Sequence, residues 1–199
     1  MKSAFSLAFA VPFALITTAC SSSMNTPDIK QNPHPKMRYE ITVTIDGAPG
    51  PFDSISGFMQ YEVTNKQCIP LTGGPMNAMR IPPTAHPAID FKRVSDNVYT
   101  GTVYADYFLD EDYFGEGVCH WSLMSATARL KVKNLTLVPY LLSDEIFSQK
   151  SVEAYFVRGD YSDNDQERGS SGSRRSSDYP PELQKDIFSI TLVAKESIP

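Results

Sequence analysis

The sequence contains none of the short motifs that mark the commonest catalytic and cofactor sites. It has no Gly-x-Ser-x-Gly nucleophile elbow, no phosphate-binding loop and no glycine-rich dinucleotide fingerprint. The nearest approach, Gly169-Ser170-Ser171-Gly172, has a different spacing and lies in a polar stretch. Paired carboxylates can hydrolyse glycosidic bonds, but here no cleft is framed around them. We therefore expect a protein that is not an enzyme and that uses no cofactor.

Histidine is scarce, and its positions do not indicate a metal site. His34, His86 and His120 are far apart, and no His-x-x-x-His or Cys-x-x-Cys spacing is present. We interpret His120 as an exposed strand residue rather than a general base. Residues 160–167 place several oxygen ligands at short spacing, but they lack the glycine of an EF-hand loop. A solvated loop is the preferred interpretation, with cation binding as the open alternative.

Basic residues are outnumbered by acidic ones. The chain has 18 Lys and Arg against 23 Asp and Glu, which gives a formal net charge of −5. Loss of the first 19 residues, which include Lys2, would leave 17 basic against 23 acidic residues, or −6. Nucleic-acid phosphates need a basic footprint, and an anionic membrane repels an acidic surface. The composition therefore argues against nucleic acid as a partner and against electrostatic adhesion to a membrane.

Long apolar runs are lacking except at the N-terminus. The first three residues form a short, positively charged start, and residues 4–16 are mostly apolar. Small residues follow at 17–19, so residues 1–19 have the layout of a secretory signal peptide. The apolar run is too short to span a bilayer as a helix, and Pro12 interrupts it.

A cysteine follows this segment directly, in Thr17-Thr18-Ala19-Cys20. A Cys just after a small residue at the cleavage point resembles the lipobox of bacterial lipoproteins. In that family a large aliphatic residue usually stands where this chain has Thr17. The resemblance implies that Cys20 is lipidated and that the protein belongs to the cell envelope. Its domain would then lie in the periplasm, with the outer membrane favoured over the inner. An ordinary cleaved signal with a nearby structural Cys is the alternative.

Only three cysteines are present, and lipidation of Cys20 would leave Cys68 and Cys119. An even number of cysteines in an oxidising compartment predicts a disulfide between them. Two free buried thiols are the alternative. Residues 65–87 are too rich in proline to form a continuous strand or helix, and the disulfide would pin the start of this segment.

After the signal peptide 180 residues remain, which suits one domain with its own core. Residues 20–36 are polar and interrupted by proline, so we expect a lipidated Cys followed by a flexible tether. Residues 37–199 would form the single β-rich domain. Within it, residues 159–179 have the composition of a disordered loop.

Apolar residues alternate with polar ones in several segments, which is typical of strands. The clearest alternation covers residues 37–46, and antiparallel pairing with a second strand at 55–63 is the simplest arrangement. Further strands are expected at 88–94, 135–138, 152–158 and 187–194, and short helical turns at 143–150 and 180–183. No βαβ rhythm is present. The pattern predicts a mainly β fold, an antiparallel β-sandwich or barrel of about eight strands with one or two short helical turns.

Residues 98–132 are predicted to form the central hairpin of this sheet. Both ends are rich in β-branched, aromatic and small residues, and the middle contains Gly115 and Gly117. In the returning strand the apolar set changes parity at Leu123 and Met124. Because strand side chains alternate between faces, the change predicts a β-bulge or a stretch buried on both sides.

The connection of this hairpin, residues 106–117, is the candidate binding site. It has five acidic residues and four aromatic residues but no Lys or Arg. Aromatic side chains often anchor binding hot spots, and carboxylates steer a basic partner. The alternative is that the rings fold back onto the core and the acids form a solvated turn. The predicted partner-binding residues are Tyr107, Phe108, Asp110, Glu111, Asp112, Tyr113 and Phe114.

The lipobox, the tether, the small β-rich domain and the acidic loop resemble, in general plan alone, a group of envelope lipoproteins. These are immunity proteins, which neutralise secreted antibacterial toxins or lipases. The resemblance implies a membrane-anchored periplasmic protein that occludes its partner with a preformed loop. No motif carries residue roles across. The alternative is a structural or assembly lipoprotein that binds an envelope component through an exposed strand edge.

Overall fold

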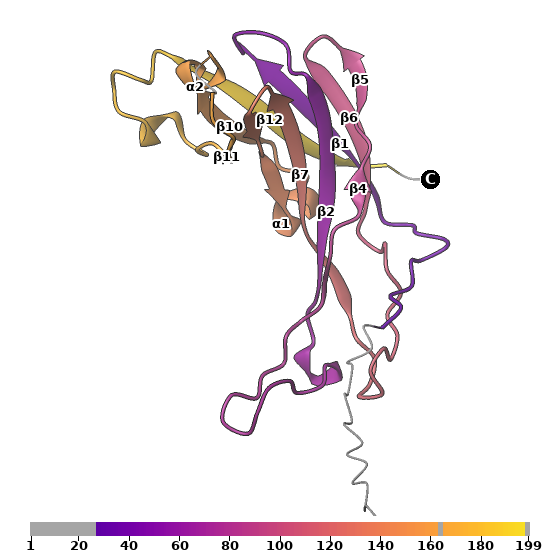
Figure 1. Ribbon diagram of the computed structural model, residues 1–199. Coiled ribbons are helices and arrows are strands. Elements are labelled where there is room, and N and C mark those ends of the chain that lie inside the picture. Colours follow the sequence, from indigo (N-terminus) through magenta and orange to yellow (C-terminus); the bar gives the residue numbers. More distant parts are fainter. Residues whose placement is uncertain (1–26, 163–164, 198–199) are drawn as a thin grey trace, which may run out of the picture.

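The computed structural model describes residues 27–162 and 165–197, which form two packed β-sheets with a few short helices (Figure 1). The predicted signal peptide, Cys20 and the first part of the predicted tether lie outside the described residues. The β-sandwich is therefore confirmed, and the sheets do not close into a barrel.

One sheet has five antiparallel strands with β1 (Arg38–Asp46) at its centre. On one side of β1 lie β12 (Ile187–Glu196) and then β10 (Val152–Val157). On the other side lie β6 (Val98–Tyr104) and the edge strand β5 (Lys92–Ser95). Alternate residues of β1 face the core because strand side chains point to opposite faces in turn. The buried set in β1 is Tyr39, Ile41, Val43 and Ile45.

The second sheet has seven strands built around the long pair β2 (Ser54–Val63) and β7 (Trp121–Val132). Two short strands, β3 (Thr84–Ala85) and β4 (Ala88–Ile89), pair with β2. Two others, β8 (Leu135–Leu137) and β9 (Tyr140–Leu142), pair with β7. The edge strand β11 (Arg168–Ser170) adds to β8 in parallel.

The structure corrects the expected central hairpin. β6 pairs with β1 and β5, whereas β7 pairs with β2, β8 and β9, so the two strands belong to different sheets. Residues 105–120 therefore cross from one sheet to the other. The expected pairing of β1 with β2 is wrong for the same reason, because β1 lies between β12 and β6. Alternation shows which face of a strand is buried, and it does not show which strand is the neighbour.

The predicted bulge is confirmed within β7. The register opposite β2 passes from Gln60↔Ser125 to Tyr61↔Leu123, which leaves Met124 without an opposite residue. The extra residue brings Trp121 and Leu123 onto the buried face although their parity differs from that of Leu130. The residues from 125 to 128 are also buried on both faces of the sheet.

The helices are shorter than the sequence predicts. α1 (Ser143–Phe147) begins at the expected residue and buries Ile146. Its N-cap position is Leu142, whose N–H donates to Oε2 of Glu145 at 2.8 Å. The carboxylate of Glu145 in the first turn thus satisfies the backbone N–H of the N-cap residue, as in a capping box, although Leu142 has no side-chain acceptor of its own. The other helices are η1 (Lys66–Cys68), α2 (Arg158–Ser162) and η2 (Ser176–Asp178).

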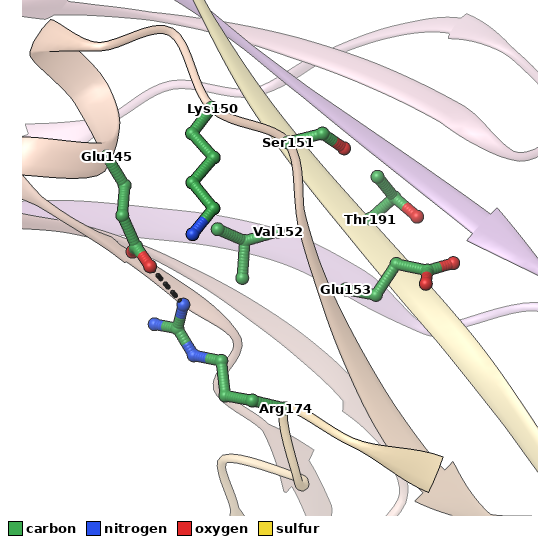
Figure 2. A pocket seen from close by; sticks show the side chains of 7 residues that line it. All are labelled: Glu145, Lys150, Ser151, Val152, Glu153, Arg174 and Thr191. Atoms are coloured by element: carbon green, nitrogen blue, oxygen red, sulfur yellow. Dashed lines mark hydrogen bonds and ion pairs between the residues drawn. The ribbon is translucent and has the colours of Figure 1, made fainter.

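Residues 159–179, which the sequence predicts to be a disordered loop, contain defined secondary structure. They contain α2, β11 and η2, apart from residues 163 and 164, which are not described. Tyr155 and Ser173 exchange backbone hydrogen bonds of 2.8 and 3.0 Å. Figure 2 shows Arg174 directed toward Glu145 of α1, and their atoms Nη1 and Oε1 are 2.6 Å apart. Hydrogen bonds to distant strands hold this segment, so its low apolar content did not predict its order.

A single apolar core lies between the two sheets, and both contribute to it. Its largest fully buried side chains include Ile41 and Ile190 from one sheet and Tyr61, Leu130 and Leu137 from the other. No helix among the described residues is long and apolar enough to cross a membrane.

Candidate functional site

Two long loops leave the sandwich at the same end and are joined covalently. The acidic loop, residues 106–117, connects β6 to β7, and the arm, residues 64–83, connects β2 to β3. Figure 1 shows β2 leading away from the body into the arm, and the chain between β6 and β7 reaching the same end of the molecule. The predicted disulfide between Cys68 and Cys119 is confirmed, with Cα atoms 5.3 Å apart and both residues buried.

The first two rings of the acidic loop point into the molecule. Tyr107 stacks on Tyr61 at 5.8 Å between ring centroids, and Phe108 meets the edge of Tyr61 at 5.1 Å. Phe108 also lies 5.0 Å from the ring of Trp121. The Tyr61 hydroxyl donates to the carbonyl of Tyr104, and burial raises the pKa of this phenol far above its ordinary value.

The other two rings are also partly buried and pack against the core. The hydroxyl of Tyr113 donates to the carbonyl of Leu109 at 2.7 Å, and burial raises the pKa of Tyr113. Phe114 shares this half-buried environment. The four rings therefore form the base on which the loop rests. All four rings are thus half-buried.

Each acid of the loop has a partner within the chain. Asp110 accepts from the backbone N–H of Trp121 at 2.9 Å, and its other oxygen lies 2.7 Å from Nδ1 of His120. Asp112 accepts from the N–H of Gly115 at 2.7 Å. The remaining acids are paired as follows: Glu111 with Lys30 at 2.7 Å, Glu116 with Arg80 at 3.3 Å, and Asp106 with the N–H groups of Lys36 and Met37 at 2.8 and 3.0 Å.

These pairings leave much of the carboxylate surface in contact with solvent. The side chains of Asp110, Glu111 and Glu116 are 46, 36 and 43% exposed, and Asp112 is also exposed. The loop itself has no basic residue, but neighbouring segments supply Lys30, Arg80 and His120. Counting charges within the loop could not reveal these partners, because His120 lies just beyond the loop and Lys30 and Arg80 are distant in sequence.

Residues 27–36, which the sequence predicts as part of a flexible tether, lie along the acidic loop. Gln31 forms a β-bridge with Phe108. The N–H of Asn32 donates to the carbonyl of Tyr107 at 2.8 Å, and the N–H of Leu109 donates to the carbonyl of Lys30 at 3.0 Å. Ile29 packs against the core. Backbone pairing and the carboxylate of Asp106 fix this segment. Neither interaction requires apolar residues at regular spacing, so the sequence pattern did not predict it.

The arm has its own internal structure. Thr72 and Met79 form a small antiparallel bridge with hydrogen bonds of 2.8 and 2.9 Å, and Asn77 closes the turn onto Gly74. The guanidinium of Arg80 donates to the carbonyl of Ile69 and, at 3.3 Å, to that of Gln67. The arm nevertheless leaves four large apolar side chains exposed: Leu71, Met76, Met79 and Ile81.

A recess beside α1 is lined by several charged side chains, but their arrangement does not resemble a ligand-binding site. Figure 2 shows its lining, which consists of Glu145, Lys150, Ser151, Val152, Glu153, Arg174 and Thr191. Arg174 is held by Glu145, by the Tyr140 carbonyl at 3.1 Å and by the face of the Tyr140 ring. These contacts fasten β11 and the chain after it to the body. Among the described residues, no group of three His, Cys, Asp or Glu side chains is arranged to hold a metal ion.

Comparisons with models of protein families, with curated protein sequences and with solved structures gave no match to this chain.

Proposed function

We propose that this chain is a lipid-anchored binding protein of the cell envelope that recognises a protein partner through its acidic loop. The proposal follows the plan of immunity lipoproteins, which occlude a secreted toxin or lipase. One observation carries it: an ordered loop presents exposed carboxylates on a base of packed aromatic rings.

The packing of the rings supports a preformed surface. Tyr107 and Phe108 are fixed against Tyr61 and Trp121, so the loop backbone has little freedom left to lose on binding. Rigid contact loops bind more tightly because the ordering cost is met during folding. In this proposal the rings support the loop, and the carboxylates of Asp110, Asp112 and Glu116 face the partner.

Charge supports a basic partner. Carboxylates at the rim of an interface mainly accelerate association, and salt screens their effect. Val118, which follows the acidic loop directly in sequence, is exposed and would supply apolar contact area. The interaction therefore combines steering by the acids with a small apolar contact.

The test replaces the exposed carboxylates by amides of the same shape, in the triple variant Asp110→Asn, Asp112→Asn and Glu116→Gln. The amide oxygens keep the acceptors for the N–H groups of Trp121 and Gly115. Glu182→Gln, an exposed acid on a different segment, is the matched control.

The partner is obtained by trying the product of the adjacent gene or by capture from the periplasm. Association of the triple variant should be several-fold slower at low salt, and the difference should vanish at high salt. The control should associate like the unmodified chain. Equal association rates for all three proteins at low salt would remove the acidic loop from the interface.

A further inference from the structure

The arm exposes apolar side chains in unusual density. Of the ten large apolar side chains that the described residues leave exposed, four lie between residues 71 and 81. Met76, at the turn, is fully exposed, and Leu71, Met79 and Ile81 are more than half exposed. Clustered apolar exposure of this kind marks a contact surface, whereas single exposed residues are ordinary.

The exposure does not arise from a loose chain. The bridge between Thr72 and Met79, the turn at Gly74 and Asn77, and the bonds of Arg80 fix the backbone on both sides of Met76. The disulfide fastens Cys68, near the base of the arm, to Cys119, two residues after the acidic loop. The arm is thus a rigid projection with an apolar end.

The charge of the arm differs from that of the rest of the chain. Residues 64–83 include no Asp or Glu, and their charged residues are Lys66 and Arg80. The whole chain carries a formal net charge of −5. An apolar end without acids can approach anionic headgroups without the repulsion that most of this surface would meet.

The N-terminal segment shows which surface lies near the arm. Residues 27–36 are bonded along the acidic loop, and the disulfide joins the arm to Cys119, whose N–H donates to the carbonyl of Glu111 in that loop. Only the six residues 21–26 separate this segment from Cys20. Even a fully extended chain of that length spans only about 25 Å. A lipid on Cys20 would therefore keep this end of the domain close to the bilayer.

We propose that the apolar tip of the arm, formed by Leu71, Met76, Met79 and Ile81, seats in the headgroup region of the bilayer that holds the lipid on Cys20. The occupant of this surface is the lipid bilayer itself. The tip acts as a second membrane contact, and two contacts hold the domain more firmly than the lipid alone. The two contacts also fix the orientation of the domain, which holds the acidic loop at a constant height above the membrane. This inference rests on the lipid anchor of the proposed function.

The test uses the full chain purified from membranes and reconstituted into phosphatidylethanolamine–phosphatidylglycerol vesicles. The vesicles carry lipids with a nitroxide quencher near the headgroup. Met76→Trp reports the tip, and Leu183→Trp reports an exposed apolar position away from the arm. Trp121 is buried and gives the same background in both variants.

The tip variant should show a blue-shifted emission and at least twofold stronger quenching than the Leu183→Trp control. The acidic-loop triple variant, combined with Met76→Trp, should retain this quenching, because the two surfaces are separate. Mass spectrometry of the same samples reports the lipid on Cys20.

Three results would overturn the proposal in distinguishable ways. An unmodified Cys20 refutes the anchor of the proposed function and this inference together. A lipidated chain in which the Met76→Trp and Leu183→Trp variants are quenched equally refutes only the insertion of the tip into the membrane. Equal quenching combined with weaker partner binding by Met76→Asp would assign the tip to the protein partner instead.

Discussion

Removal of the disulfide should reveal how strongly the two loops depend on it. The bond joins residues 51 apart in sequence and lies where the arm and the acidic loop leave the sandwich. A cross-link that closes a loop of this size restricts the unfolded chain and stabilises the fold by about 4 kcal/mol in the chain-entropy description. For a domain of this size, 1 kcal/mol corresponds to about 2–4 °C in the melting temperature. The double variant Cys68→Ala with Cys119→Ala should therefore melt about 8–16 °C lower than the unmodified chain.

Calorimetry or circular dichroism measures this shift, and mutation is preferred to reduction because both cysteines are buried. Ser125→Ala removes one heavy atom from another small buried residue without opening a cross-link, and it is the control. Thiol labelling of the denatured, unreduced chain should find neither Cys68 nor Cys119 free. A melting temperature within about 3 °C of the unmodified chain would show that the bond does not constrain the unfolded state as this reasoning requires.

The remaining predictions concern the core, the tyrosine cluster and the anchor. A methyl group at Gly57 would lie 2.5 Å from the Thr127 carbonyl and 2.6 Å from the Phe91 ring, so Gly57→Ala should lower the unfolding free energy by about 1–3 kcal/mol in denaturant titrations. Tyr61→Phe should lose the bond to the Tyr104 carbonyl at a cost of about 1 kcal/mol. Because the pKa of Tyr61 is raised in the folded state, the phenol contributes its full stabilisation below about pH 10 and loses it as pH rises. Tyr61→Phe should therefore lose less stability in alkaline titrations than the unmodified chain. Cys20→Ala should release the protein from membranes or leave its signal peptide uncleaved, as fractionation and immunoblotting would show; normal membrane attachment would rule out the lipoprotein interpretation.

The sequence was sufficient where one local rule decides the outcome. Side-chain alternation located β1 and β12 within a few residues, and the parity change located the bulge at Met124. Both follow from the period of two, which holds for any strand. The disulfide followed from the expectation that the chain is exported and that Cys20 is lipidated, which leaves two cysteines to pair.

The partners of the strands could not be predicted in the same way. β6 and the two ends of β7 bury alternate residues, and a hairpin or a crossing between sheets would give the same alternation. The choice depends on contacts between distant strands, such as the pairing of Thr44 with Val98 and of Val63 with Trp121. Such contacts leave no local pattern in the sequence.

Polar segments were predicted to be flexible because amino-acid composition indicates only how much apolar surface a segment can bury. Residues 27–36 and much of 165–179 bury little apolar surface, yet they are fixed by hydrogen bonds to segments far away in the chain. The side-chain amide of Asn32, for example, donates to the carbonyl of Asp106 at 2.9 Å, across 74 positions. Backbone groups satisfied in this way order a polar strand without hydrophobic residues.

The internal pairing of the acids does not remove them from a role in binding. Ion pairs on an exposed surface contribute little to stability, because water screens them and long side chains lose freedom in forming them. A basic group from a partner can therefore replace Arg80 beside Glu116 at small cost. Arg80 would still donate to the carbonyls of Ile69 and Gln67, so the arm would keep its conformation. Asp110 differs, because one of its oxygens accepts from the backbone of Trp121 and fixes the start of β7. In the proposed function, a basic group of the partner would replace Arg80 at Glu116, whereas Asp110 would keep its bond to Trp121 and the base of the loop would stay fixed.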